Sequence, residues 1–272
     1  MPIAQALKKK RNHSLYAVPF FIFILLFSSL SQAEERAKWA LGLGAGWLQD
    51  YPGSDQGRIR FLPFPVYRGK TFRIDRATGV EGKVFDTSRL SFSWNFIFQF
   101  PTESEAITVR KGMPNLDWVL SIGPQMKYVL WRSSNQTFFF RFPARLNTCT
   151  NFSKVTRFCG IAFNPGFRHA IRTKKYGDFT ARLEAFSHTS EYHQYFYEVH
   201  PDYATASRPA FHARSGFLGT VTGLFHSLPF KGWELVSSFN VYEYGMNVNR
   251  ESPLFRKTTN LAVFFAATID FK

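Results

Sequence analysis

Residues 187–198 hold the closest grouping of nucleophilic, basic and acidic side chains in the chain. His188 and Ser190 are two positions apart, so on a β-strand their side chains would point to the same face. A histidine base beside a serine nucleophile, with Glu191 or Glu198 to orient it, could cleave an ester bond. The same residues would equally form a polar strand end that leads into a loop. We favour the second interpretation and expect no catalytic residue.

The chain has two cysteines, Cys149 and Cys159, whose separation would close a small loop. In a protein exported to an oxidising compartment they would pair as a disulfide. The alternative is two free thiols near a surface turn. Two cysteines without paired histidines nearby make a weak metal site. We therefore expect a disulfide, no metal and no cofactor.

From about residue 38 onward, apolar and polar residues alternate, which is the period of a β-strand with one apolar face. The clearest run places aromatic and aliphatic side chains on one face: Leu90, Phe92, Trp94, Phe96, Phe98 and Phe100. The same alternation recurs over residues 117–130, 179–185, 233–241 and 261–271. The elements that position any functional side chain are therefore strands.

A β-sandwich and a β-barrel both alternate in this way, and three features favour the barrel. Several runs are longer than the roughly 5–6 residues usual in soluble sheets. The apolar face is rich in Phe and Trp near the strand ends, as in the aromatic girdles of membrane barrels. The other face carries charges that a lumen would accept: Lys127, Arg141, Arg145, Arg168, Arg172, Arg182 and Glu184. These seven are the candidate lumen residues.

The amino-acid composition also favours a membrane-embedded barrel. Of the 272 residues, 18% are aromatic and 32 are Phe, more than a soluble core needs. Lys and Arg number 34 against 19 Asp and Glu, a net charge of +15 that suits anionic partners such as lipopolysaccharide phosphates. Nucleic acid is not expected as a partner, because the start of the chain looks like a secretion signal.

That start has the three parts of a cleaved signal peptide. Lys8 to Arg11 are basic, Leu15 to Leu30 are mostly apolar, and Ser31-Gln32-Ala33 is a small-x-small cleavage site. The alternative, a membrane anchor, is disfavoured because a span needs about 20 apolar residues. We expect residues 1–33 to be removed and residues 34–272 to form the barrel.

The connections alternate between short and long, as in bacterial barrels with short periplasmic turns and longer outer loops. Short connections are expected near residues 68–70, 86–88, 133–135, 173–176 and 228–231. Long connections are expected near residues 50–57, 101–115, 149–157, 191–211 and 246–255. The alternation holds if residues 71–85 form two short strands that turn at residues 77–79. We therefore predict an all-β fold, a transmembrane antiparallel up-and-down β-barrel of about 12 strands, with 10 as the alternative.

Several motifs, in consistent order, resemble the MipA/OmpV family of outer-membrane proteins. They are Trp39–Gly46 with Tyr51–Asp55, Leu62–Pro65, Lys111–Asp117 with Ile122–Pro124, Tyr195–Val199, Arg208–Phe211 and Glu251–Leu254. Two positions depart from the family pattern: Glu198 replaces a frequent glycine, and the chain ends in Phe271-Lys272 instead of a terminal aromatic residue.

The resemblance implies a non-enzymatic scaffold in the outer membrane of a Gram-negative bacterium. Members of this family are associated with murein synthesis, where they bridge a lytic transglycosylase and a bifunctional penicillin-binding protein. One alternative is a narrow pore whose basic lumen admits small anionic solutes. Another is a lipid-active hydrolase, because His188-x-Ser190 is similar to the His-x-Ser of lipid A deacylase barrels. A filled lumen would favour the scaffold, and a continuous channel lined by arginines would favour the pore.

Overall fold

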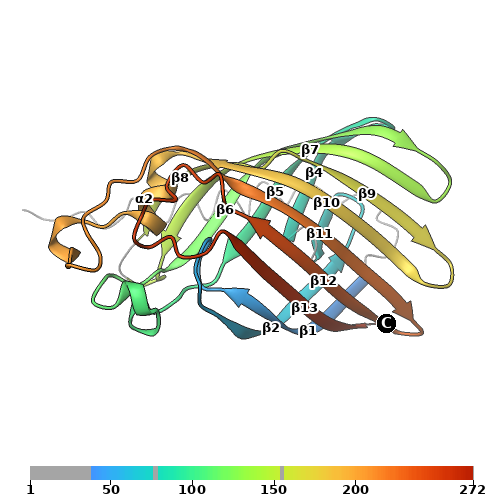
Figure 1. Ribbon diagram of the computed structural model, residues 1–272. Helices are drawn as coiled ribbons and strands as arrows, with labels where there is room; N and C mark the ends of the chain where they lie inside the picture. Colours follow the sequence, from blue (N-terminus) through green and yellow to red (C-terminus); the bar gives the residue numbers. More distant parts are fainter. Residues whose placement is uncertain (1–37, 76–78, 154–155, 272) are drawn as a thin grey trace, which may run out of the picture. The chain divides into compact units, whose positions relative to one another are not determined.

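The computed structural model describes residues 38–75, 79–153 and 156–271, and in this part of the chain 13 strands form one antiparallel sheet (Figure 1). The expected signal peptide lies outside the described residues. The strands are β1 (Lys38–Gln49), β2 (Gly57–Arg68), β3 (Phe72–Asp75), β4 (Gly79–Asp86), β5 (Leu90–Gln99), β6 (Trp118–Arg132), β7 (Gln136–Thr150), β8 (Thr156–Phe163), β9 (Gly166–Thr173), β10 (Gly177–His188), β11 (Gly216–Phe230), β12 (Trp233–Glu243) and β13 (Thr259–Asp270). One α-helix, α2 (Ser190–Tyr197), follows β10.

The sheet closes on itself, because β1 pairs with β13 as well as with β2. β8 and β9 occupy a single position in the barrel, since both pair with β7 on one side and β10 on the other. The interruption falls at Asn164-Pro165, where proline cannot donate a ladder hydrogen bond. The segment between the expected connections near residues 149–157 and 173–176 is therefore one strand position with a break in it. The barrel has 12 strand positions, which confirms the prediction of 12 over 10.

The short and long connections lie at opposite ends of the barrel. We call them the short-turn end and the long-loop end. Of the hairpin turn predicted at residues 77–79, only Gly79 is described, because residues 76–78 lie outside the described residues. The two short strands on either side are present as β3 and β4.

The outer surface is apolar, and its large side chains are strongly exposed. Examples from four strands are Leu43, Phe61, Leu183, Phe265 and Ile269, with 53–76% of their surface accessible. Aromatic pairs mark the short-turn end, such as Trp39 with Tyr67 and Phe230 with Trp233. Phe98, Phe100, Trp118 and Phe152 form a chain of ring contacts at the long-loop end. An apolar belt between two aromatic girdles is the surface that a membrane-spanning barrel presents to lipid.

The long loops gather at one end of the barrel (Figure 1). Their buried side chains form one apolar core there, which we call the cap core. Its buried members come from four long loops, from α2 and from strand ends: Tyr51, Ile107, Leu116, Val119, Cys149, Cys159, Tyr192, Phe196, Tyr197, Ala213, Leu218 and Tyr244. Hydrogen bonds join the loops to each other. The Tyr51 hydroxyl donates to the Leu254 carbonyl at 2.6 Å, and the Tyr197 hydroxyl donates to the Pro52 carbonyl at 2.9 Å.

Side chains also fill the lumen beside β1. The inward positions Gly42 and Gly44 have no side chain, and the rings of Phe64 and Phe264 occupy the space that a Cβ would need, 2.3 Å from each ideal Cβ position. Phe264 packs with Val236 and Ala266 in a second small core. The glycines of β1 therefore let aromatic side chains lie flat against the barrel wall.

Candidate functional site

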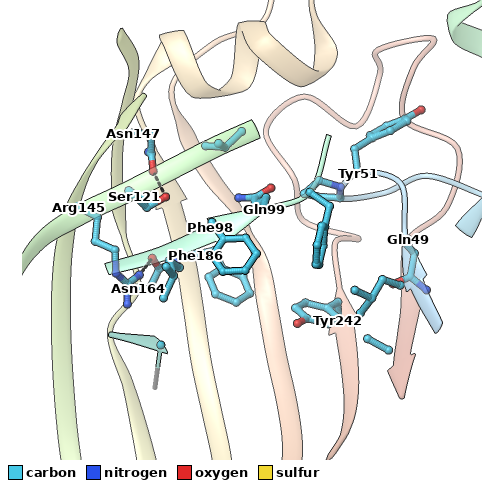
Figure 2. A pocket seen from close by; sticks show the side chains of 18 of the residues that line it. Gln49, Tyr51, Phe98, Gln99, Ser121, Arg145, Asn147, Asn164, Phe186 and Tyr242 are labelled. Carbon is cyan, nitrogen blue, oxygen red and sulfur yellow. Dashed lines mark hydrogen bonds between the residues drawn. The ribbon is translucent and has the colours of Figure 1, made fainter. Parts of the chain in front are cut away.

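A cavity of about 590 Å³ lies in the lumen beneath the cap core. It falls within the range of about 300–1,000 Å³ that is typical of ligand sites. Figure 2 shows Arg145, Asn147 and Asn164 on one side of this cavity, with Tyr51 and Tyr242 on the other. One wall is therefore polar and basic, and the other is largely aromatic.

Three arginines surround the single carboxylate of Glu184, which is buried. Arg168 is the closest, with Nη2 2.6 Å from Oε1. Arg182 Nη1 lies 3.5 Å from Oε2, and Arg141 Nη1 lies 3.8 Å from Oε1. We call Arg141, Arg145, Arg168, Arg182 and Glu184 the arginine cluster. All five line the cavity.

Arg145 is held by neutral groups. Its Nε donates to Asn95 Oδ1 at 2.8 Å, and its Nη1 donates to Asn164 Oδ1 at 2.9 Å. Arg182 likewise donates to Asn240 Oδ1 at 2.7 Å. The alternation correctly places Asn95 and Asn240 on polar faces, but it gives no indication that these amides would position guanidinium groups.

The cluster has more positive charge than its surroundings balance. The cluster holds four guanidinium groups and only one carboxylate, that of Glu184, and Arg141 reaches the further carboxylate of Glu81 through Gln125. The buried polar atoms that have no hydrogen-bond partner in the described part of the chain include two donors of residues that line the cavity, Arg141 Nε and Asn147 Nδ2. Excess cationic charge and unused donors are the chemistry of an anion site.

The other two candidate lumen residues do not join the cluster. Lys127 faces inward, but its ammonium lies 4.5 Å from the ring centre of Phe139, and it does not line the cavity. Arg172 lies at the short-turn end with 81% of its side chain exposed, 3.9 Å from Asp178. Of the seven candidates, the structure brings together five.

The hydrolase arrangement is not formed. β10 ends at His188 and α2 begins at Ser190, so the two residues are not on one strand face, contrary to the premise of that interpretation. His188 is buried and stacks on Tyr192, with ring centres 3.9 Å apart. Among the described residues, no hydrogen bond joins His188 to Ser190. The helix replaces the extended geometry that the pair would need.

Two neighbouring titratable groups on α2 are uncharged: Tyr192, a member of the cap core, and His193 beside it. Burial raises the pKa of Tyr192 to about 12, and its hydroxyl accepts a hydrogen bond from Gln99 Nε2 at 2.7 Å. Burial also lowers the pKa of His193, so its ring is neutral and its Nε2 lies 3.1 Å from the Gly216 carbonyl oxygen. Neither group supplies charge to a ligand, and both act in packing the cap.

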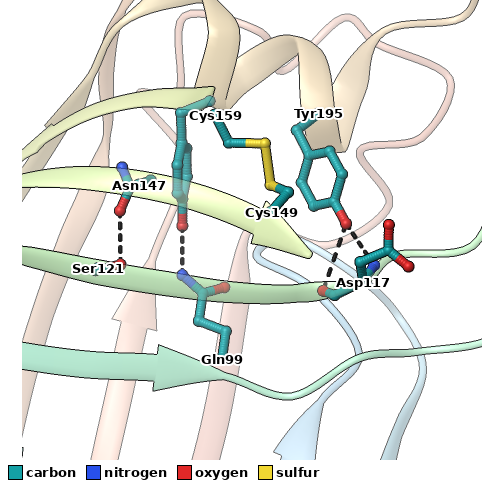
Figure 3. Close-up of a disulfide and its surroundings, with 8 residues drawn as sticks. Gln99, Asp117, Ser121, Asn147, Cys149, Cys159 and Tyr195 are labelled. Atoms are coloured by element: carbon teal, nitrogen blue, oxygen red, sulfur yellow. Dashed lines mark hydrogen bonds between the residues drawn. A yellow bond between two sulfur atoms is a disulfide. The ribbon is translucent and has the colours of Figure 1, made fainter. Parts of the chain in front are cut away.

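The sulfur atoms of Cys149 and Cys159 are bonded, and the Cα atoms lie 5.8 Å apart (Figure 3). Both cysteines belong to the cap core and are almost fully buried. Beside them, Tyr195 on α2 accepts a hydrogen bond from the backbone N–H of Asp117. The disulfide therefore ties the β7–β8 loop to the core under α2.

Replacing both cysteines with alanine should leave the barrel assembled and loosen this loop. The closed loop is short, so the chain-entropy model allows only about 2–3 kcal/mol for the bond. The folded protein should still show heat-modifiable gel migration. Trypsin added outside intact cells should cut between residues 149 and 159 faster than in the unreduced wild type. Cutting that requires a permeabilised outer membrane would show that this loop does not face outward.

The model of the MltA-interacting protein MipA family matches residues 41–271, which is most of the chain. The chain belongs to the MipA family. The family match covers every strand except the first three residues of β1. No curated protein matches the chain.

Three solved barrels resemble this MipA-family chain weakly. The CymD monoaromatic hydrocarbon channel has a TM-score of 0.35 and 9% identity, covering 91% of this chain and 92% of that one. The Pseudomonas putida toluene transporter TodX has a TM-score of 0.34 and 6% identity, covering 89% and 91%. The Ralstonia pickettii toluene transporter TbuX has a TM-score of 0.34 and 8% identity, covering 89% and 91%. Likenesses this weak carry no argument about function.

Proposed function

We propose that this protein is a non-enzymatic docking barrel of the Gram-negative outer membrane, which holds a peptidoglycan-cleaving enzyme at its periplasmic end. The observation that carries the proposal is the basic rim of the short-turn end. The family description, MltA-interacting protein, supports a lytic transglycosylase as the first partner. A bifunctional penicillin-binding protein is the second, and outer-membrane lipid and lipopolysaccharide surround the belt.

The orientation follows from the lengths of the connections. In bacterial barrels the short turns face the periplasm and the long loops face outward. The cap core then lies on the outer side and covers the lumen there. A barrel covered in this way supports docking better than conduction along its axis.

The short-turn end is strongly basic. Seven exposed residues form what we call the basic rim: Lys70, Arg89, Arg132, Arg172, Lys174, Lys175 and Lys231. Among the described residues, the exposed acids at the same end are fewer, namely Asp86 and Asp178, and the partly exposed Glu234 and Asp270 are paired with Arg68. Short turns offer little area, so recognition here depends on charge, which raises the association rate and selects an acidic partner surface.

Reversing two rim charges should weaken docking. The double change Lys174→Glu, Lys231→Glu should lower co-purification of the lytic transglycosylase from detergent-solubilised envelopes about tenfold, because each rim charge changes sign at the contact. The effect should shrink as salt is raised, since exposed charges are screened.

The matched control is Lys111→Glu, Lys257→Glu, which makes the same charge change at the exposed long-loop end. This variant should bind the enzyme as the wild type does. Equal losses in both variants would show that net charge matters and the rim does not, and this would contradict the proposal.

A pore for small anionic solutes is the second candidate, and the arginine cluster is the observation that favours it. Its excess positive charge would select anions. Conduction along the axis would require the cap core to leave the long-loop end, where several loops are joined by buried hydrogen bonds. We therefore place it second.

A further inference from the structure

Within the described residues, the barrel wall contains one strand, β2, that has hydrogen-bonded partners along only one of its two edges for most of its length. β2 pairs with β1 along its whole length, but with β3 only through Tyr67 and Arg68. In the part of the chain that the structure describes, no strand pairs with this second edge of β2 from Gly57 to Val66. The next wall strand of full height is β5, which pairs with β4 only as far as Phe96. The upper wall between β2 and β5 therefore lacks strand pairing.

Two prolines in β2 are consistent with an edge that makes no strand hydrogen bonds. A proline has no N–H, so in a sheet it is confined to positions where that nitrogen faces an unpaired edge. Pro63 and Pro65 both lie in the stretch that is paired with β1 throughout. Because they are two residues apart, their nitrogen atoms point to the same edge, and that edge is the open one.

The opening between β2 and β5 has an apolar rim. Inward or edge positions of the two strands supply Leu62, Phe64 and Ile97, and the β3–β4 hairpin below supplies Ile74 and Val80. Outward side chains beside it are apolar and exposed, with Phe61 at 76% and Ile59 at 62%. The rim therefore faces the same environment as the lipid belt.

Polar contacts connect β2 to the loop after β5 on the long-loop side of the opening. Arg60 on β2 donates to the Thr102 hydroxyl at 2.8 Å and lies over the Phe100 ring, 5.2 Å from its centre. Arg60 also lies 3.7 Å from Asp50. These contacts join β2 to the loop that follows β5, so the opening is a window in the wall and does not extend to the barrel mouth.

The window and the arginine cluster belong to one cavity. The lining runs from Leu62, Phe64 and Ile97 at the window to Arg145 and Arg182 on the far wall. One end is thus apolar and meets the lipid belt. The other end carries excess positive charge and the unused donors Arg141 Nε and Asn147 Nδ2.

We propose that this cavity takes a single-chain anionic amphiphile, such as a long-chain fatty acid, sideways from the bilayer. The headgroup lies at the arginine cluster and the chain lies along the rim between β2 and β5. A carboxylate suits planar guanidinium groups, which bind it through paired N–H donors. A volume of about 590 Å³ is small for a lipid with several acyl chains and fits a single chain. The proposal goes beyond docking and does not depend on it.

The test uses the full mature chain refolded in phosphatidylcholine vesicles with a fatty acid that carries a diazirine at the chain end. After irradiation, mass spectrometry should locate the label on residues 62–65 and 96–98. Unlabelled oleate should compete the label away, and methyl oleate should compete at least tenfold less well. This comparison needs no variant, so it stands even if a lumen substitution fails to fold.

A matched pair of variants tests the headgroup site. Arg145→Gln removes a cavity cation, and Lys127→Gln removes a lumen cation that does not line the cavity. Both should be checked for heat-modifiable migration first. Labelling should fall several-fold in Arg145→Gln and stay unchanged in Lys127→Gln. Label spread evenly over the belt, or equal competition by the methyl ester, would overturn the proposal. Loss of partner docking with intact labelling would leave it standing.

Discussion

Changing Gly123 to alanine should lower the yield of folded barrel about tenfold, because two strands approach each other too closely there for a side chain. A Cβ at this position would lie 1.9 Å from the Ala144 carbonyl oxygen and 2.8 Å from the Arg145 Cα on β7. Overpacking a tight site costs about 1–3 kcal/mol. These contacts are with backbone atoms, which cannot rotate away, so we expect the upper part of that range.

Gly245→Ala is the matched control, because a Cβ at Gly245 meets nothing within 4 Å. Both variants should be refolded into vesicles and scored by the heat-modifiable gel band. Gly245→Ala should fold like the wild type. If Gly123→Ala folds equally well, the close approach of β6 and β7 is not a real constraint on assembly. The presence of Gly123 in the family-like motif Ile122–Pro124 would then need another explanation.

Glu184→Gln should destabilise the folded barrel by about 3–5 kcal/mol, the usual cost of leaving a buried charge without its partner. Gln has the same shape, so packing is kept while Arg168, Arg182 and Arg141 lose their shared negative charge. Four guanidinium groups would then repel one another in the lumen, where most of them are buried. The urea midpoint of the vesicle-bound protein, followed by tryptophan fluorescence, measures the loss.

Two further variants make this result specific. Glu251→Gln removes an exposed carboxylate from a long loop and should leave the midpoint unchanged. Adding Arg168→Gln to Glu184→Gln should recover part of the loss, because one repelling charge is removed with its partner. A Glu184→Gln midpoint equal to that of the wild type would mean that Glu184 does not balance the arginine cluster.

The strand alternation made the barrel, its belt and its two kinds of connection predictable from the sequence. Alternation reports which face a residue occupies, and a closed barrel has only two faces. This is why Arg141, Arg145, Arg168, Arg182 and Glu184 could be placed in the lumen before any coordinates. It also explains why Arg172 was wrongly placed among the candidate lumen residues. A polar-face residue at a strand end lies in solvent at the rim of the barrel.

Features that depend on contacts between distant segments were not predictable. The window needs the registers of β2 with β3 and of β4 with β5, and single-strand patterns do not encode register between neighbours. The cap core assembles loops separated by up to two hundred residues, as in the Tyr51–Leu254 hydrogen bond. The helix from Ser190 lies in the long connection expected near residues 191–211, and strand alternation gives no indication of it, because it depends on Tyr192, Phe196 and Tyr197 being buried together in the cap core.

The most direct test of the docking account is photo-cross-linking in living cells from both ends of the barrel. A benzophenone amino acid is placed at Ser134 or Lys174 in the short turns, and at Ser207 in an exposed long loop. After irradiation, covalent products are purified and identified by mass spectrometry. The account predicts adducts with the lytic transglycosylase from Ser134 and Lys174 and none from Ser207. Adducts from Ser207 alone, or no adduct with any murein enzyme from either turn, would contradict it.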